Sequence, residues 1–215
     1  MKDKSDMLLA VLIDADNIPY AHVAEMLDEI TKYGLPTIKR IYGDWTRPSA
    51  NGWKSSLLQH AIQPIQQYGY TTGKNATDSA MIIDAMDILH SDKVDGFCLV
   101  SSDSDFTRLA TRLRESGKMV IGIGEKKTPN PFIVACDKFI YIEILSGKDD
   151  EKSDSSQPKN NKKVEKQNTK FDAIDFKLIR LLKATVNDIA DDDGWAFLAE
   201  IGALLNKKKP DFDPR

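Results

Sequence analysis

The stretch from Leu8 to Asn17, LLAVLIDADN, constrains the fold of this chain more than any other. Its apolar run ends abruptly in two acids and an amide. An uninterrupted apolar run is typical of a strand buried on both faces, as in a parallel sheet covered by helices. Ligands of such sheets bind just beyond the carboxyl ends of the strands. We therefore expect Asp14, Asp16 and Asn17 to stand at the mouth of a binding site.

A second stretch with the same pattern, FCLVSSDSD at 97–105, ends in Asp103 and Asp105. If the two strands are neighbours, four carboxylates converge on one small volume. Crowded carboxylates repel one another by several kcal/mol at a reduced effective dielectric. A hard divalent cation, which prefers oxygen ligands, would neutralise them. The two stretches together predict a metal site.

A further acid comes from the segment after Lys74. Thr77 is a residue type that caps helices. The helix that follows has an apolar stripe at Ile82, Ala85, Met86 and Leu89. Asp78 precedes this stripe by one i, i+4 step, so its carboxylate should face inward at the first turn. The alternative is that Asp78 only complements the helix dipole. Asp84 and Asp87 fall on other faces, where we expect solvated surface.

The remaining apolar segments alternate between strand and helix patterns. We expect strands at 37–42, 68–72, 119–124 and 139–144, and helices after Pro19, over 54–61 and after Ser104, which we expect to cap its helix. Pro64 should interrupt the pattern of the second of these helices. This order predicts an α/β fold, doubly wound around a mostly parallel sheet with right-handed crossovers.

Composition sets the outer limits of the interpretation. With 215 residues, 41% of them apolar, the chain can form one α/β domain and a small second unit. The net charge of −3 indicates no strong overall attraction to nucleic acid or acidic membranes, although local basic patches remain open. Cys98 and Cys136 lie in apolar contexts, which favours reduced core thiols. The sequence shows neither a membrane-spanning run nor an N-terminal signal, so we expect a cytoplasmic location.

The composition changes completely between residues 146 and 170. This stretch has one valine and no aromatic residue, which predicts a flexible linker. A second unit begins near Phe171 and has two amphipathic patterns separated by an acidic turn at 191–194. Their apolar positions are Ile174, Leu178, Leu181 and Leu182, and then Leu198, Ile201, Gly202 and Leu205. We expect a helix–turn–helix unit that is marginal as an independent core.

Three motifs in sequence carry a resemblance to a known family. DADN at 14–17, GKNATD at 73–78 and SSDSDF at 101–106 together resemble the NYN family of PIN-like metal-dependent ribonucleases, in particular its bacterial LabA-like type. The resemblance implies a three-layer, PIN-like (Rossmannoid) fold with a mostly parallel twisted sheet over residues 1–145. Residues 146–170 would be the linker. Residues 171–215 are similar to the first half of a LOTUS (OST-HTH) domain, a small RNA-binding module, and would form a partial one.

The resemblance also implies roles for the acids. Asp14, Asp78 and Asp103 would be the core ligands of Mg²⁺ or Mn²⁺, directly or through water, with Asp105 as a fourth acid. Asn17 would fix Asp14 or a metal-bound water. Such ions can activate water and stabilise charge during hydrolysis of a phosphodiester bond. Asp16 would either accept a hydrogen bond behind the site or cap the following helix. The implied activity is that of an endoribonuclease acting on single-stranded or structured RNA.

The sequence indicates the substrate-binding residues less clearly than it indicates the acids. Lys74 precedes Asp78 closely and is a candidate for phosphate binding. Arg47, Lys54 and Lys126 lie on loops or at a helix start that should reach the same sheet edge and could hold phosphates, but we favour ordinary surface positions for them. Trp45 would either stack on an unpaired base or pack under its own loop. A homodimer also stays open, because domains of this kind can pair through an exposed helix or sheet edge.

Two other functions compete with the nuclease. A phosphatase of the haloacid-dehalogenase type also places D-x-D after its first strand, with Asp14 as nucleophile. Ile18 stands where that family has a hydroxylic residue, which counts against it. The other competitor is a non-catalytic RNA-binding or assembly module in which the acids hold metal structurally. DNA in place of RNA as the substrate also stays open.

Overall fold

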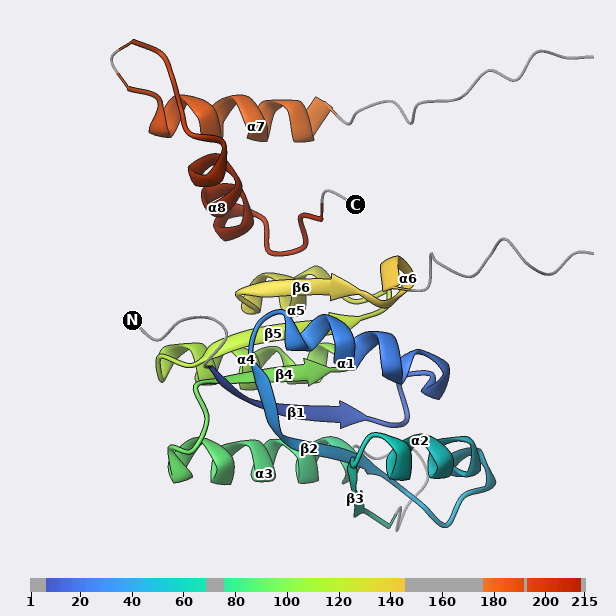
Figure 1. Cartoon of the computed structure of the whole chain (residues 1–215). Helices are drawn as coiled ribbons and strands as arrows, with labels where there is room; N and C mark the ends of the chain where they lie inside the picture. Colours follow the sequence, from blue (N-terminus) through green and yellow to red (C-terminus); the bar gives the residue numbers. More distant parts are fainter. Residues whose placement is uncertain (1–6, 69–75, 146–175, 192, 214–215) are drawn as a thin grey trace, which may run out of the picture. The chain divides into compact units, whose positions relative to one another are not determined.

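A six-stranded, wholly parallel sheet forms the centre of the larger unit of this protein. The computed structural model describes residues 7–68, 76–145, 176–191 and 193–213 (Figure 1). The strand order is β3-β2-β1-β4-β5-β6. The strands are β1 (Leu8–Asp14), β2 (Leu35–Gly43), β3 (Gln63–Gln66), β4 (Gly96–Val100), β5 (Met119–Gly124) and β6 (Lys138–Tyr141). This confirms the predicted α/β fold.

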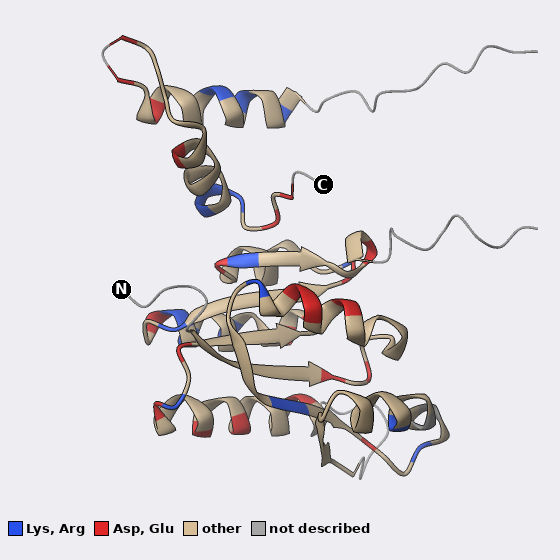
Figure 2. Cartoon of the chain, viewed as in Figure 1, with Lys and Arg blue, Asp and Glu red and all other residues tan. Residues whose placement is uncertain are grey.

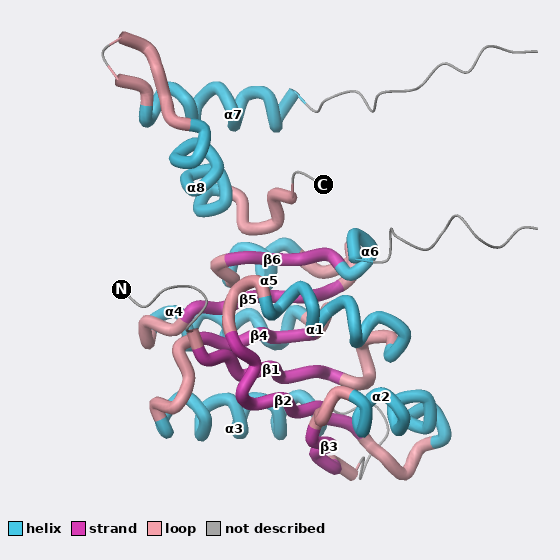
Figure 3. The backbone as a smooth tube through the Cα atoms, in the orientation of Figure 1, coloured by secondary structure: helices cyan, strands magenta, loops and turns pink. Residues whose placement is uncertain are grey.

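Helices cover both faces of the sheet (Figure 3). They are α1 (Val23–Thr31), α2 (Trp53–Gln59), α3 (Ala76–Ser91), α4 (Thr107–Glu115), α5 (Asn130–Ala135) and α6 (Ile142–Leu145). One buried cluster joins the sheet to α3, α4 and α5, and the other joins it to α1, α2 and α6. The unit therefore has three layers, helix, sheet and helix.

The alternation of side chains along β1 explains the two clusters. Leu9, Val11 and Ile13 belong to one cluster, and Ala10 and Leu12 belong to the other. All five are fully buried, because strand residues alternate between the two faces of a sheet and both faces are covered here. The continuous apolar run of the sequence is thus a strand with no solvent-facing side.

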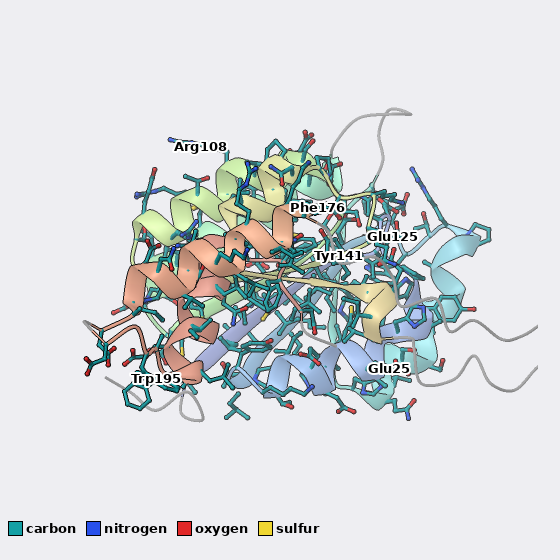
Figure 4. All side chains as sticks on the ribbon, turned by 90° about the horizontal axis from the view of Figure 1, so that it is seen from above. Glu25, Arg108, Glu125, Tyr141, Phe176 and Trp195 are labelled. Carbon is teal, nitrogen blue, oxygen red and sulfur yellow. The ribbon has the colours of Figure 1, made fainter. Side chains whose placement is uncertain are left out.

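The helices present one apolar face to the sheet and one polar face to water. In α4, Leu109, Ala110 and Leu113 are buried, whereas Arg108 points away from the sheet (Figure 4). The same spacing in α1 buries Val23, Met26, Leu27 and Ile30. Both helices were predicted at these places in the sequence. The caps differ from expectation, since Asp103, and not Ser104, caps the 3₁₀ turn Ser104–Phe106 that precedes α4.

The strand order creates a switch point between β1 and β4. The chain builds outward from β1 to β2 and β3, and then α3 crosses back so that β4 pairs with the other side of β1. The segments that leave the carboxyl ends of β1 and β4 therefore diverge. In open parallel sheets this is where a crevice forms and where ligands bind.

The third and last strands differ from the sequence prediction. We expected a strand at 68–72, but Tyr68 lies in a loop, 69–72 fall outside the described residues, and the strand is β3, which contains Pro64. Proline lacks a backbone N–H but is tolerated in an edge strand, where one side needs no partner. The expected strand at 139–144 is also shorter, since it ends at Tyr141 and the chain turns directly into α6.

Asp84 is also placed differently from expectation. It accepts hydrogen bonds from the Arg40 guanidinium and from the Tyr42 hydroxyl, both on β2, and it is only 20% exposed. Burial, together with this carboxylate, raises the pKa of Tyr42. The prediction of a solvated Asp84 was wrong, because α3 packs against β2 and Asp84 meets two polar side chains of that strand. Asp87 is exposed as predicted.

The second unit contains two packed helices, α7 (Phe176–Ile189) and α8 (Leu198–Lys208). Thr185 on α7 and Leu205 on α8 are buried, whereas Phe176 and Trp195 are largely exposed. Across the described ranges, no helix combines the length and apolar character needed to cross a membrane. Cys98 and Cys136 are buried and unpaired, as predicted.

We predict that Asp84→Ala destabilises the larger unit by about 1–3 kcal/mol, because it leaves the buried Tyr42 hydroxyl and the Arg40 guanidinium without their acceptor. Urea unfolding followed by circular dichroism measures this change. Asp87→Ala, one turn further along α3, is the control and should stay within about 0.5 kcal/mol of the wild type. Equal effects of the two substitutions would contradict the assigned network.

Candidate metal centre

The acids of the two sequence motifs meet at the switch point. β1 ends at Asp14, and Ile13 pairs with Val100, the last residue of β4. Figure 2 shows acidic residues at the carboxyl end of β1. α3 begins at this edge as well, since a helix that follows a parallel strand runs back along the sheet. Asp78 in its first turn is thereby brought to the ends of β1 and β4.

Asp14 is a buried carboxylate held by three hydrogen bonds. It is 1% exposed. Its Oδ1 accepts from the Asp16 backbone N–H at 3.1 Å, and its Oδ2 accepts from Asn17 Nδ2 at 2.6 Å and from Ser101 Oγ at 2.8 Å. Burial raises the pKa of Asp14, and the three hydrogen bonds act against this rise. The side chain is therefore fixed in one orientation.

Ser101 connects the two strands and was not singled out from the sequence. Its hydroxyl donates to Asp14 and accepts from the backbone N–H of Asp103 at 3.1 Å. The residue is fully buried. A serine that directly follows a wholly apolar strand, two residues before an acid, is the signal that could have identified it, because a buried hydroxyl needs a partner.

Asp78, Asp103 and Asp105 form the acidic cluster of the site. Each offers one carboxylate oxygen, and these atoms lie within 4.8 Å of one another. The Asp105 backbone N–H donates to Asp103 Oδ1 at 2.9 Å, which orients that carboxylate. Burial, followed by repulsion from Asp14, Asp103 and Asp105, raises the pKa of Asp78 to about 6. Asp78 thus faces inward, as its place on the apolar stripe predicts.

Asp16 lies next to the cluster. Its Oδ2 accepts from Thr77 Oγ1 at 3.3 Å, in the first turn of α3. Thr77 therefore lies inside the helix and does not cap it. Asp16 does not cap the 3₁₀ turn Tyr20–His22 either, since Pro19 holds that position without a side-chain hydrogen bond. Of its two expected roles, the hydrogen-bond acceptor is the one present.

The predicted substrate residues that the structure describes lie on different loops and helices of the larger unit. Arg47 pairs with Asp44, with its Nε 3.3 Å from Oδ2, and Lys126 has an exposed side chain whose backbone N–H donates to Glu143. Lys54 is exposed on α2. Lys74 lies outside the described residues. Trp45 is half-buried beside the loop that follows β1.

The donor set suits a hard divalent cation. Carboxylate oxygens are the ligands that Mg²⁺ and Mn²⁺ prefer. Burial and then repulsion from the neighbouring carboxylates raise the pKa of Asp78, and a bound cation would relieve this repulsion. Asp14 is not one of the three clustered acids. It is joined to them through Ser101 and the backbone of Asp103.

We predict that Asp78→Asn raises the melting temperature of the metal-free protein at pH 7.5. The folded-state pKa of about 6 lies above the ordinary value of 3.8, so the fold favours the protonated acid. The stability linked to this group is present below about pH 4 and is lost as the pH rises through about 6. Melting curves in EDTA at pH 3.5 and 7.5 measure the difference.

The exposed Asp87→Asn is the matched control and should show no pH-dependent difference from the wild type. An Asp78→Asn protein that melts at or below the wild-type temperature at pH 7.5 in EDTA would contradict the electrostatic cost assigned to the cluster.

Comparisons with known proteins agree with this geometry. The NYN domain model matches residues 8–143, and the OST-HTH/LOTUS domain model matches residues 170–215. A crystal structure of VPA0982, a protein of unknown function from Vibrio parahaemolyticus, is similar in fold, with a TM-score of 0.55 and 21% sequence identity. The similarity covers 66% of this chain and 96% of that one. No curated protein matches the sequence.

The NYN match includes the ends of β1 and β4 and the start of α3, where the acids stand, and it covers more than half of the chain. The protein therefore belongs to the NYN domain family of PIN-like nucleases, and its NYN domain is followed by an OST-HTH/LOTUS domain.

Proposed function

We propose that this protein is a metal-dependent endoribonuclease. The observation that carries the proposal is the convergence of Asp78, Asp103 and Asp105, with carboxylate oxygens within 4.8 Å, at the switch point of an NYN domain. Sites of this kind in open parallel sheets are accessible from the sheet edge, where an extended strand of RNA can pass. The reaction would be hydrolysis of internal phosphodiester bonds.

The chain's own acids divide into two groups in this proposal. Asp78, Asp103 and Asp105 would hold Mg²⁺ or Mn²⁺, with Asp14 binding behind them directly or through water. Asn17 and Ser101 fix the orientation of Asp14. When bound, the ion would supply charge stabilisation and activation of water at the scissile phosphate.

The assignment of RNA as the substrate is supported by the second domain. OST-HTH/LOTUS domains are RNA-binding modules, and the matched region includes both α7 and α8. We propose that residues 1–145 form the nuclease domain, 146–170 a linker and 171–215 the RNA-targeting unit. The exposed run Lys207 to Lys209 at the end of α8 is suited to contact with the RNA backbone.

The phosphatase alternative is disfavoured by the state of Asp14. A nucleophilic aspartate must present a carboxylate oxygen to its substrate. Asp14 is 1% exposed, and both of its oxygens accept hydrogen bonds from the chain. The non-catalytic alternative makes the same structural demands as the nuclease, so only an activity measurement separates the two.

We predict that the protein makes internal cuts in a labelled RNA that contains a hairpin and single-stranded flanks, in Mn²⁺ or Mg²⁺ and not in EDTA. The double variant Asp14→Asn/Asp103→Asn should lose this cleavage by at least about 100-fold, since it removes charge from both strands that form the site. Gel analysis of the products measures this, with the exposed Asp87→Asn as control and single-stranded DNA of the same sequence as a second substrate.

Intact RNA under every condition, from a folded protein that binds metal, would contradict the nuclease. Tight RNA binding with unchanged RNA length would then support the non-catalytic module.

We also predict that Ser101→Ala weakens Mn²⁺ binding about 10- to 100-fold, because groups that orient metal ligands typically contribute this much to affinity. Titration calorimetry measures the affinity without reference to activity. Ser104→Ala, an exposed serine in the same motif, is the control and should bind Mn²⁺ like the wild type. Equal affinities for the two variants would remove Ser101 from the site.

A further inference from the structure

A pocket of about 100 Å³ lies beside the acids, between the loops that follow β1 and β2. Ala15 and Asp16 line it from β1, and residues 43–45 line it from the end of β2. Ala50 and Trp53 complete it. None of these residues belongs to the acidic cluster, so the pocket is an additional feature of this sheet edge.

Trp45 forms a wall of the pocket whose position is fixed. Its backbone N–H donates to Gln66 Oε1 at 3.0 Å, and its indole Nε1 donates to the Ile65 carbonyl at 3.0 Å. Both acceptors belong to β3. Because both N–H groups are held by a neighbouring strand, the ring is set in place before any ligand arrives. The side chain is only half-buried and leaves part of the ring accessible. A rigid, partly exposed indole is a suitable platform for stacking a planar ring.

Gly43 leaves the floor of the pocket open. A side chain at this position would begin 3.0 Å from Ala15 Cβ and 3.9 Å from Trp45 Cζ2. A Cβ would therefore crowd Ala15 and occupy space beside the indole. The absence of a side chain at the end of β2 keeps the pocket between Ala15 and Trp45.

The polar groups at the pocket suit a hydrogen-bond donor better than a phosphate. Asp16 and Asp44 both line it. Asp44 is already paired with Arg47 and accepts from Gln66, so the exposed Asp16 is the acid that would accept a hydrogen bond from an N–H group of a ligand. Each of the four RNA bases carries an N–H or amino donor on its Watson–Crick edge. The chemistry of the pocket therefore fits a base better than it fits the sugar–phosphate backbone.

Asp16 joins the pocket to the acidic cluster. Its backbone N–H donates to Asp14, and its carboxylate accepts from Thr77, the residue before Asp78. A ligand in the pocket would thus contact a residue that is hydrogen-bonded both to Asp14 and to the neighbour of Asp78. A nucleotide whose base enters the pocket could therefore place its own phosphate at the acids.

We propose that this pocket binds one unpaired base of the nucleotide next to the scissile phosphate, with the base stacked on Trp45. The inference rests on the proposed nuclease function and narrows its substrate to RNA that is single-stranded at the cut. The pocket of about 100 Å³ is smaller than an engineered cavity of about 150 Å³ that takes benzene, so it would hold part of one base and not a whole nucleotide. A base in a duplex is excluded, because its Watson–Crick edge and both of its faces are already occupied.

The test uses ten-nucleotide single-stranded RNAs, each with one abasic position. Cleavage is measured with the wild-type protein in Mn²⁺, and binding is measured by fluorescence anisotropy with Asp103→Asn, which should not cut. One abasic position beside the cut should weaken binding roughly 5- to 100-fold, the range for loss of one stacked base. Trp45→Leu should weaken binding of the intact RNA by a similar factor and should not weaken binding of that abasic RNA further.

Trp45→Phe should restore most of the affinity, because a smaller ring still stacks. Tyr68→Leu, which removes an exposed aromatic side chain outside the pocket, should leave the affinity unchanged. Melting curves of each variant establish that it is folded, and the abasic series needs no change in the protein.

The outcomes separate the pocket from the nuclease itself. If the RNA is cleaved but every abasic position weakens binding equally, the base pocket is wrong and the nuclease proposal stands. The same holds if the RNA is cleaved and Trp45→Leu further weakens binding of the RNA that is abasic beside the cut. Absence of cleavage together with a single critical abasic position overturns the nuclease and keeps the pocket as an RNA-binding site.

Discussion

The hydrogen bonds that Asp14 accepts determine how the rest of this site is arranged. A buried carboxylate is costly unless its oxygens are satisfied, and here the chain satisfies both. One of the donors, Ser101, belongs to the segment that leaves β4 and also binds the backbone of Asp103. The two central strands are therefore tied together beyond their backbone ladder. This fixes where the acids after β4 stand relative to the acid that ends β1.

Bringing these carboxylates together in a partly buried place is electrostatically unfavourable. Three further acids offer carboxylate oxygens within 4.8 Å of one another, and burial together with repulsion from the neighbouring carboxylates raises the pKa of Asp78 to about 6. The surrounding fold tolerates this because two extensive apolar clusters, one on each face of the sheet, hold the strands in register. Groups with shifted pKa values are frequent at functional sites, and here a cation would relieve the part of the shift that comes from repulsion between carboxylates.

Much of this arrangement could be predicted from the sequence, and the exceptions have physical causes. The unbroken apolar runs before Asp14 and Asp103 correctly indicated buried parallel strands, and the periodicity of the segment after Lys74 correctly placed Asp78 inward. Contacts between residues that are far apart in the sequence produce no such pattern in the sequence. Asp84 was assigned to water because helical periodicity says nothing about Arg40 and Tyr42 on a neighbouring strand.

Local rules also failed where tertiary context overrides them. Pro64 suggested a break, but β3 is an edge strand, in which a missing N–H costs little.

The positions of the acids, in contrast, follow from topology and are open to direct observation. Anomalous diffraction from crystals soaked in Mn²⁺ tests the central claim. The account predicts a peak about 2.0–2.4 Å from carboxylate oxygens of Asp78, Asp103 and Asp105. A well-ordered acidic cluster with no such peak, at a Mn²⁺ concentration at which the protein binds the ion in solution, would contradict the account.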